Sequence, residues 1–308
     1  MRATMTPTRW MLGFVSLVFA TTLGCAPDKM PESTVPGETG KVNVVATTTM
    51  IADLARQIGG HRVTVKSIMA PGGDPHVYKP VPGDANAIAK ADVVFVNGLK
   101  LEHWIDDLIK TAQAKRVVVV TEGVSHRASP LDPKVPDPHV WFDVARWRLA
   151  AANVAKGLAA ADPKGASTYE ENGTLYDRQL AALDAWVLQR AREIPPARRK
   201  LVTSHDAFAY FGDAYGFEVI PVQGISTDAE ASTKDVVRVV ETIKKAGVPA
   251  LFVETSVNPK LIEQVARETK TRVGGALYSD STGPIDSSAG SYIGMVRDNV
   301  SLIVEGLK

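Results

Sequence analysis

This sequence has almost no cysteine, almost no excess of basic over acidic residues, and few long apolar runs. It has a single cysteine in 308 residues, so no disulfide can form within the chain. The 35 basic and 34 acidic side chains leave a formal net charge of +1, which gives no support to a nucleic-acid-binding surface. The mean hydropathy lies near zero, which argues against several membrane spans. What remains is ordinary for a soluble globular protein of one large domain or two.

The most extended apolar run lies close to the N-terminus. Arg2 and Arg9 frame its basic start, and the run "WMLGFVSLVFATTLGC" is followed by a polar stretch rich in Pro and Gly. This order is typical of a signal peptide, here residues 1–25, and the run is too short for a comfortable membrane-spanning helix. Its end, "TLGC", resembles a bacterial lipobox and predicts lipidation of Cys25, although Thr22 stands where leucine is preferred. An uncleaved anchor helix and a free buried thiol are the alternatives.

Beyond the signal peptide, we expect residues 26–40 to form a flexible tether, because this stretch lacks the apolar content to fold. From Val42 onward, short β-branched runs alternate with helical patterns. The strand-like runs are "VNVVA", "VTVKSI", "DVVFV" and "RVVVV", then "KLVTS", "EVIPV", "ALFVE" and "RVGGAL". The first four runs predict buried strands of a parallel sheet, and the last four predict strands of a second lobe. The predicted fold class is therefore α/β, with two similar β/α lobes over residues 41–164 and 197–308.

The two predicted lobes are separated by one long helical pattern. Apolar residues recur at mostly three- and four-residue spacing from Tyr169 to Ile194, and Pro195 and Pro196 follow. This pattern predicts a single linking helix over residues 165–196. Because one long helix is a stiff connector, we expect no large hinge opening between the lobes. In the second lobe, the spacing of Ser232 and Asp235 indicates a capping box at a helix start.

The tripeptide Asp-Pro-His occurs twice, in "GGDPHVYKP" and in "PDPHVWFD", although the chain has only six histidines. Ligands of open α/β sheets bind beyond the carboxyl ends of strands. His76 and His139 each follow a predicted strand of the first lobe, and His205 and Asp280 each follow one of the second. Three imidazoles and one carboxylate suit a first-row divalent ion, and the prolines stiffen the two turns. We therefore predict a metal site from these four residues.

Each of these residues also has a simpler explanation. Asp-Pro is a common turn starter, His205 could begin a helix capped by Ser204, and Asp280 could be a turn or cap residue. It is their joint placement at strand ends that favours a metal site. We interpret the remaining histidines as surface or loop residues: His61, His103 and His126.

The main rival function is that of a secreted metallohydrolase. Neither His-Glu-x-x-His nor Gly-x-Ser-x-Gly occurs in the sequence, and no Gly-x-Gly-x-x-Gly follows an early strand. Catalytic zinc usually keeps an open coordination position, whereas four protein ligands close a tetrahedral site. We therefore predict that the chain is not an enzyme, and an open coordination position would favour the rival.

A resemblance to a known protein family rests on several longer stretches, which cover nearly the whole chain from residue 42 onward. They are "GGDPHVYKP", "NGLKLEHW", "DPHVWFD", "TSHDAFAYFGDAYG", "STDAEASTKDV", "FVETSVNPK", "GGALYSD" and "GSYIGMVRDNV". Their content and order resemble the zinc/manganese ABC-transporter solute-binding proteins of the TroA-like type (cluster A-I). The resemblance implies two β/α lobes, a rigid linking helix, and Zn²⁺ or Mn²⁺ held between the lobes by His76, His139, His205 and Asp280. It also implies an exported receptor, lipid-anchored through Cys25 or periplasmic, that passes its ion to a membrane permease. We expect a monomer without a nucleic-acid partner.

The identity of the metal is less sharply indicated. Manganese- and iron-type relatives often have Glu where this chain has His205, and three nitrogen ligands favour zinc. Zinc-dedicated relatives, however, often carry a long His- and Asp-rich loop before the second ligand, where this chain has only a short segment containing His126. We predict zinc, with manganese as the alternative. Asp143 and Glu254 are predicted to orient the ligand rings, although either could be a cap or surface residue. The sequence does not separate transport from an adhesin role.

Overall fold

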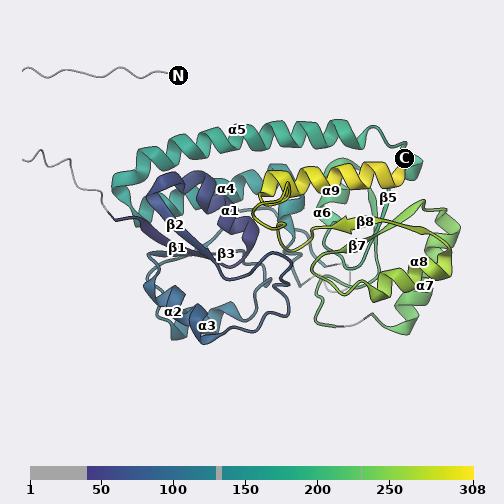
Figure 1. Cartoon of the computed structure of the whole chain (residues 1–308), viewed down its shortest axis with the longest axis horizontal. Coiled ribbons are helices and arrows are strands. Elements are labelled where there is room, and N and C mark those ends of the chain that lie inside the picture. The colour runs from purple at the N-terminus through teal and green to yellow at the C-terminus, as the bar shows by residue number, and fades with distance from the viewer. Residues whose placement is uncertain (1–39, 130–133, 230) are drawn as a thin grey trace, which may run out of the picture. The chain divides into compact units, whose positions relative to one another are not determined.

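The computed structural model describes residues 40–129, 134–229 and 231–308. The predicted signal peptide, Cys25 and nearly all of the predicted tether lie outside these residues. Within them lie two sheets of four parallel strands each, with helices on both faces (Figure 1). This arrangement confirms the predicted α/β fold with two similar lobes. No helix in the described part of the chain has both the length and the apolar character needed to cross a bilayer.

The sheet of the N-terminal lobe has the strand order β2-β1-β3-β4. Its strands are β1 (Val42–Ala46), β2 (Val63–Ser67), β3 (Val93–Val96) and β4 (Val117–Val119). In β1, Val44 packs into a core with α1 (Thr49–Gly59) and α4 (Val144–Ala161), whereas Val45 packs into one with α2 (Pro82–Lys90) and α3 (Ile105–Thr111). Burial on both faces explains why the central strands, β1 and β3, are apolar except at the exposed Asn43. The predictions that "VTVKSI" and "RVVVV" are buried strands were wrong, because β2 and β4 are edge strands with exposed residues, and Val117 of β4 is 39% exposed.

The sheet of the C-terminal lobe has the strand order β6-β5-β7-β8. Its strands are β5 (Lys200–Thr203), β6 (Glu218–Pro221), β7 (Ala250–Glu254) and β8 (Arg272–Leu277). The helices of this lobe are α6 (Ala209–Tyr215), α7 (Thr233–Ala246), α8 (Lys260–Thr269) and α9 (Tyr292–Leu307). Ser232 caps α7 by accepting a hydrogen bond from the backbone N–H of Asp235 at 3.2 Å, as predicted. Because the strands of each sheet are parallel, their carboxyl ends lie at the same edge of that sheet.

Helix α5 (Ala166–Ala191) runs alongside both lobes (Figure 1). It packs against α1 and α4 of the N-terminal lobe and against α6 and α9 of the C-terminal lobe. Its buried side chains are those of the predicted periodic pattern: Tyr169, Tyr176, Leu180, Leu183, Val187 and Ala191. The linking helix is thus confirmed, but it ends at Ala191, before the two prolines. The lobe boundaries at residues 41–164 and 197–308 stay a prediction.

Candidate metal centre

The four predicted ligands lie together, each in a loop that follows a strand. His76 lies between β2 and α2, His139 between β4 and α4, His205 between β5 and α6, and Asp280 between β8 and α9. His76 is 3% exposed and the other three are fully buried. One ligand atom from each residue lies within 4.8 Å of those of the others. Two residues come from each lobe, as the strand-end reasoning predicted.

The spacing of the ligand atoms suits a small coordination sphere. The Nε2 atoms of His76 and His139 are 3.3 Å apart, and Asp280 Oδ1 lies 3.6 Å from His139 Nε2 and 3.9 Å from His76 Nε2. His205 Nε2 lies 3.5 Å from Asp280 Oδ2. A tetrahedral site with metal–ligand bonds of about 2.0–2.1 Å separates its ligand atoms by about 3.3 Å. The four side chains therefore surround a space of the right size for one ion.

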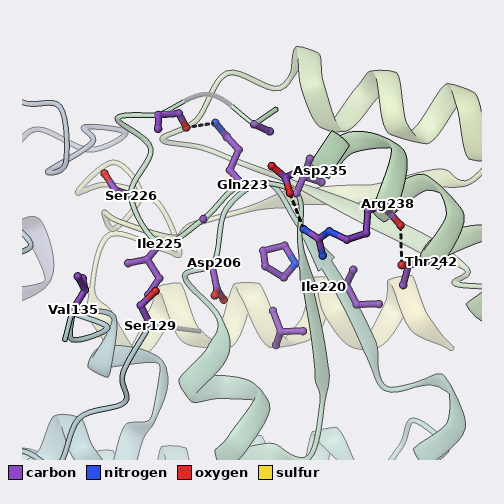
Figure 2. A pocket seen from close by; sticks show the side chains of 16 residues that line it. Ser129, Val135, Asp206, Ile220, Gln223, Ile225, Ser226, Asp235, Arg238 and Thr242 are labelled. Atoms are coloured by element: carbon purple, nitrogen blue, oxygen red, sulfur yellow. Dashed lines mark hydrogen bonds and ion pairs between the residues drawn. The ribbon is translucent and has the colours of Figure 1, made fainter. Parts of the chain in front are cut away.

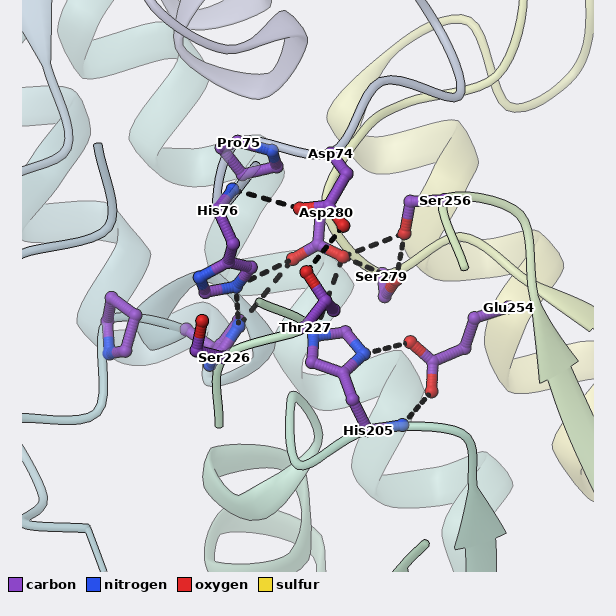
Figure 3. Close-up of polar contacts among 12 residues, drawn as sticks. Asp74, Pro75, His76, His205, Ser226, Thr227, Glu254, Ser256, Ser279 and Asp280 are labelled. Atoms are coloured by element: carbon purple, nitrogen blue, oxygen red, sulfur yellow. Dashed lines mark hydrogen bonds and ion pairs between the residues drawn. The ribbon is translucent and has the colours of Figure 1, made fainter. Parts of the chain in front are cut away.

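Two of these ligand atoms are buried without any hydrogen-bond partner among the described residues. They are Nε2 of His205 and Oδ1 of Asp280. A buried polar atom without a partner is costly, and such atoms call for an explanation such as a bound ion. The other carboxylate oxygen, Asp280 Oδ2, accepts hydrogen bonds from the hydroxyls of Ser256 and Ser279, both at 2.8 Å (Figure 3). Neither serine is part of the site predicted from the sequence.

The repeated tripeptide forms the same turn twice. Asp74 Oδ1 accepts a hydrogen bond from the backbone N–H of His76 at 2.9 Å, and Asp137 Oδ1 accepts one from His139 at 3.0 Å. An aspartate that bonds the backbone two residues on fixes a turn locally. The second turn does more, because Asp137 Oδ1 also lies 2.8 Å from Nδ1 of the His139 ring. In the first turn, Asp74 Oδ2 instead accepts from the Thr227 hydroxyl of the C-terminal lobe at 2.6 Å.

Of the two residues predicted to orient the ligand rings, Glu254 does so and Asp143 does not. Glu254, at the end of β7, contacts Nδ1 of His205 at 2.5 Å and accepts from its backbone N–H at 2.9 Å, which confirms that prediction (Figure 3). The prediction for Asp143 was wrong. Its carboxylate caps α4 by accepting from the N–H of Arg146 at 3.1 Å, and it also binds the Arg146 guanidinium. The carboxylate that holds the His139 ring is Asp137, which the sequence analysis missed.

The loop that carries Asp280 is hydrogen-bonded to the N-terminal lobe at three points. The Ser281 hydroxyl accepts from the N–H of Gly72 at 2.8 Å, and the N–H of Thr282 donates to Thr49 Oγ1 at 2.7 Å. The Trp141 indole N–H donates to the carbonyl of Ser279 at 2.9 Å.

Ser204, which the sequence offered as a helix cap before His205, caps no helix. Helix α6 begins at Ala209, and the buried Ser204 hydroxyl has no partner in the described part of the chain.

The profile of the family "ZnuA: Zinc-uptake complex component A periplasmic" matches residues 44–306 of the chain. The chain belongs to this family. It is 38% identical over 306 residues to the manganese-binding lipoprotein MntA of Bacillus subtilis, covering 97% of this chain and 98% of that protein. It is 34% identical to the metal ABC transporter substrate-binding lipoprotein FimA of Streptococcus parasanguinis, with 96% of each chain covered.

A solved structure agrees with the assignment to the ZnuA family. The periplasmic zinc-binding protein TroA from Treponema pallidum superposes with a TM-score of 0.84 at 38% identity, covering 87% of this chain and 99% of that one. The predicted resemblance is thus confirmed. These relatives are named as metal-binding or substrate-binding proteins, and the ZnuA-family chain is a binding protein rather than an enzyme.

The surroundings of the four candidate ligands in this ZnuA-family protein shift their pKa values in different directions. Burial lowers the pKa of His76 to about 3, so its ring is neutral near pH 7. Burial also opposes charge on His139, but the nearby carboxylates of Asp137 and Asp280 outweigh it and raise its pKa to about 9. The pKa of His205 is raised well above its ordinary value, because Glu254 and Asp280 outweigh burial. The pKa of Asp280 is well below its ordinary range, because the histidines outweigh burial.

The Glu254→Gln variant is expected to bind metal about 10–100-fold more weakly, as is typical when a group that orients a ligand is lost. The amide keeps the shape of Glu254 but not the charge that supports the His205 ring. Metal affinity is measured by competition with a chelator of known strength. As a control, Asp143→Ala should destabilise the fold by about 1 kcal/mol through the lost cap and leave metal affinity unchanged. Equal metal affinity in Glu254→Gln and the unmodified protein would contradict the role of Glu254.

Other features of the described chain lie outside this centre. His61, His103 and His126 are exposed, as predicted, and do not join the ligand group. A cavity of about 750 Å³ lies against β6 and the start of α7, lined among others by Asp206, Gln223 and Arg238 (Figure 2). None of the four ligands lines it, so the cavity is separate from the candidate metal centre.

Proposed function

We propose that this ZnuA-family protein captures one divalent transition-metal ion as cargo at His76, His139, His205 and Asp280. The observation that carries the proposal is the group of four buried ligand atoms within 4.8 Å. Two of these atoms have no hydrogen-bond partner in the described part of the chain. An ion placed among them would satisfy both and compensate for the burial of the carboxylate charge.

Within this proposal, zinc is the preferred cargo. The ligand set has three imidazole nitrogens, which suit zinc, whereas manganese favours oxygen ligands and higher coordination numbers. TroA, a relative of known structure, is named as a zinc-binding protein. Manganese is the second candidate, since MntA is named as manganese-binding and is similar over nearly its whole length.

The role in transport follows from the named relatives. FimA and MntA are named as lipoproteins, and FimA as a substrate-binding component of a metal ABC transporter. We infer that this chain is exported, is anchored by lipid at Cys25, and delivers its ion to an ABC permease. Residues 26–40 would then give the binding unit its reach from the membrane surface. The inferred receptor acts as a monomer and has no nucleic-acid partner.

A competition experiment tests both the capture and the preference. Metal-stripped protein is dialysed against zinc and a large excess of manganese at neutral pH, and bound metal is counted by elemental analysis. One equivalent of zinc with little manganese is the expected result. Retention of manganese against zinc would overturn the zinc preference and leave metal capture standing. The absence of any stoichiometric metal would overturn the proposed function.

A further inference from the structure

The stretch "NGLKLEHW", residues 97–104, carries part of the family resemblance but contributes none of the four candidate ligands. It connects β3 to α3, and its last residue contacts the first Asp-Pro-His turn. The Trp104 indole N–H donates a hydrogen bond to the carbonyl of Pro75 at 2.9 Å, and Pro75 is buried directly before His76. The Trp104 ring also packs against Tyr78, with 4.9 Å between the ring centroids. Trp104 therefore contacts the turn on both sides of His76.

The first residue of the same stretch contacts the second Asp-Pro-His turn. The side-chain amide of Asn97 donates to the carbonyl of Pro138 at 3.1 Å, and Pro138 is buried directly before His139. Asn97 itself is also buried. One short segment is thus hydrogen-bonded to both turns of the N-terminal lobe, in each case at the carbonyl that precedes the histidine.

The backbone between these two contacts is strained. Gly98, Leu99 and Lys100 have φ angles of 81°, 53° and 62°, so three consecutive residues lie in the left-handed region. Glycine adopts this conformation readily, whereas residues with a Cβ adopt it only at a cost in free energy. Such strain persists only where the surrounding structure imposes it, and it is concentrated at functional sites. A backbone hydrogen bond from the N–H of Leu101 to the carbonyl of Gly98 at 3.1 Å closes the turn.

A buried carboxylate holds this strained turn in place. Glu102 accepts hydrogen bonds from the backbone N–H groups of Asn97 at 2.7 Å and Gly98 at 3.2 Å. The Thr47 hydroxyl, just beyond β1, also donates to Glu102 at 2.5 Å. The Thr121 hydroxyl, just beyond β4, donates to the carbonyl of Asn97 at 2.6 Å. The segment is therefore fixed to the same sheet from which both Asp-Pro-His turns emerge.

We propose that Trp104 and Asn97 are positioning residues of the metal centre, in which Trp104 fixes the turn of His76 and Asn97 fixes the turn of His139. The proposal rests on the proposed function. The aspartates of the two turns fix each turn internally, whereas this segment fixes the two turns relative to each other, with their Nε2 atoms 3.3 Å apart. A ligand that is already held in its bound position loses less conformational entropy when the ion arrives, so the ion binds more tightly.

The test is a pair of double-mutant cycles on zinc affinity, measured by chelator competition at zinc concentrations that load each variant. Trp104→Phe keeps an aromatic ring and removes the N–H that binds Pro75. We expect this change to weaken zinc binding about tenfold in the otherwise unmodified protein. The loss should be the same in the His139→Ala background. It should vanish in the His76→Ala background, because Trp104 then has no ligand to position.

Asn97→Ala should give the reverse pattern. It should weaken zinc binding in the His76→Ala background and have no effect in the His139→Ala background. Circular dichroism checks that each variant is folded, and each of the two cycles tests the proposal independently of the other. Trp186→Phe is the matched control, because Trp186 lies on α5 beside Arg190 and Arg297 and should not change the zinc affinity in any background.

A general loosening of the segment would give a different result from loss of a specific contact. Equal losses in both single-histidine backgrounds, or no loss for either variant in the unmodified protein, would overturn the positioning roles and leave the proposed function standing. If the unmodified protein binds no stoichiometric metal, the proposed function fails, and this proposal fails with it.

Discussion

The His139→Ala variant is expected to lose stoichiometric zinc at concentrations that saturate the unmodified protein. His139 Nε2 lies 3.3 Å from His76 Nε2 and 3.6 Å from Asp280 Oδ1, in the middle of the ligand group. Its removal takes away a proposed direct ligand, so the loss in affinity should exceed the ~10–100-fold typical of losing a group that only orients a ligand. Equilibrium dialysis followed by elemental analysis measures the bound zinc.

The control for this variant is His103→Ala. His103 is exposed and stands outside the ligand group, so its replacement should leave one equivalent of zinc bound. Circular dichroism of both variants checks that the fold is kept. Full zinc binding by a folded His139→Ala protein would show that the ion binds elsewhere.

Zinc affinity is expected to fall steeply as the pH drops through neutrality. Metal ligands must be unprotonated, and each imidazolium that has to lose its proton weakens binding about tenfold per pH unit. In the metal-free protein, the pKa of His139 is raised to about 9 and that of His205 also lies well above its ordinary value. Two protons must therefore leave when zinc binds near pH 7. The zinc affinity should then change about a hundredfold per pH unit. His76 adds nothing until the pH nears its pKa of about 3.

Two measurements check this pH dependence. Chelator competition at a series of pH values gives the slope, and calorimetry in buffers of different ionisation enthalpy counts the protons released on zinc binding. A zinc affinity that does not change between mildly acidic and mildly alkaline pH would mean that both rings are already neutral without metal. That result would contradict the influence assigned to Asp137 and Glu254.

The same pKa shifts predict how the free energy of unfolding of the metal-free protein varies with pH. The folded pKa of His139, about 9, is above the ordinary value of 6.5, so its contribution is fully present below 6.5 and is lost as the pH rises through 9. His76 has the opposite sign. Its folded pKa of about 3 is below 6.5, so stability is lost as the pH falls below 6.5. Metal-free protein should therefore be most stable near neutrality.

The parts of the fold that the sequence predicted best are those buried on two sides. In β1 and β3, neighbouring residues pack into different cores, so an unbroken apolar run has one explanation. The run "RVVVV" has the same composition, yet Val117 lies on an edge strand. The order of strands in a sheet depends on contacts between distant segments, and composition does not encode it. That the four candidate ligands lie together was predictable, because the ends of parallel strands meet at one edge.

The residues that support the ligands were harder to predict. Asp137 and Asp143 lie on either side of His139 within four residues along the chain. Asp137 stands two residues before His139, where an aspartate can reach the backbone N–H and the ring together, whereas Asp143 precedes a helix and is used as its cap. Ser256 meets Asp280 only because β7 pairs with β8, so no local pattern announces it.

The bonds that hold the Asp280 loop also couple its movement to that of the N-terminal lobe. Ser279, Ser281 and Thr282 are tied to Trp141, Gly72 and Thr49 of the N-terminal lobe. Any opening that leaves these ties intact carries Asp280 away together with His76 and His139. The loops of His76 and His139 are in turn tied to the C-terminal lobe, from Asp74 to Thr227 and from Asp137 to Tyr210, so opening would require bonds on both sides of the site to break.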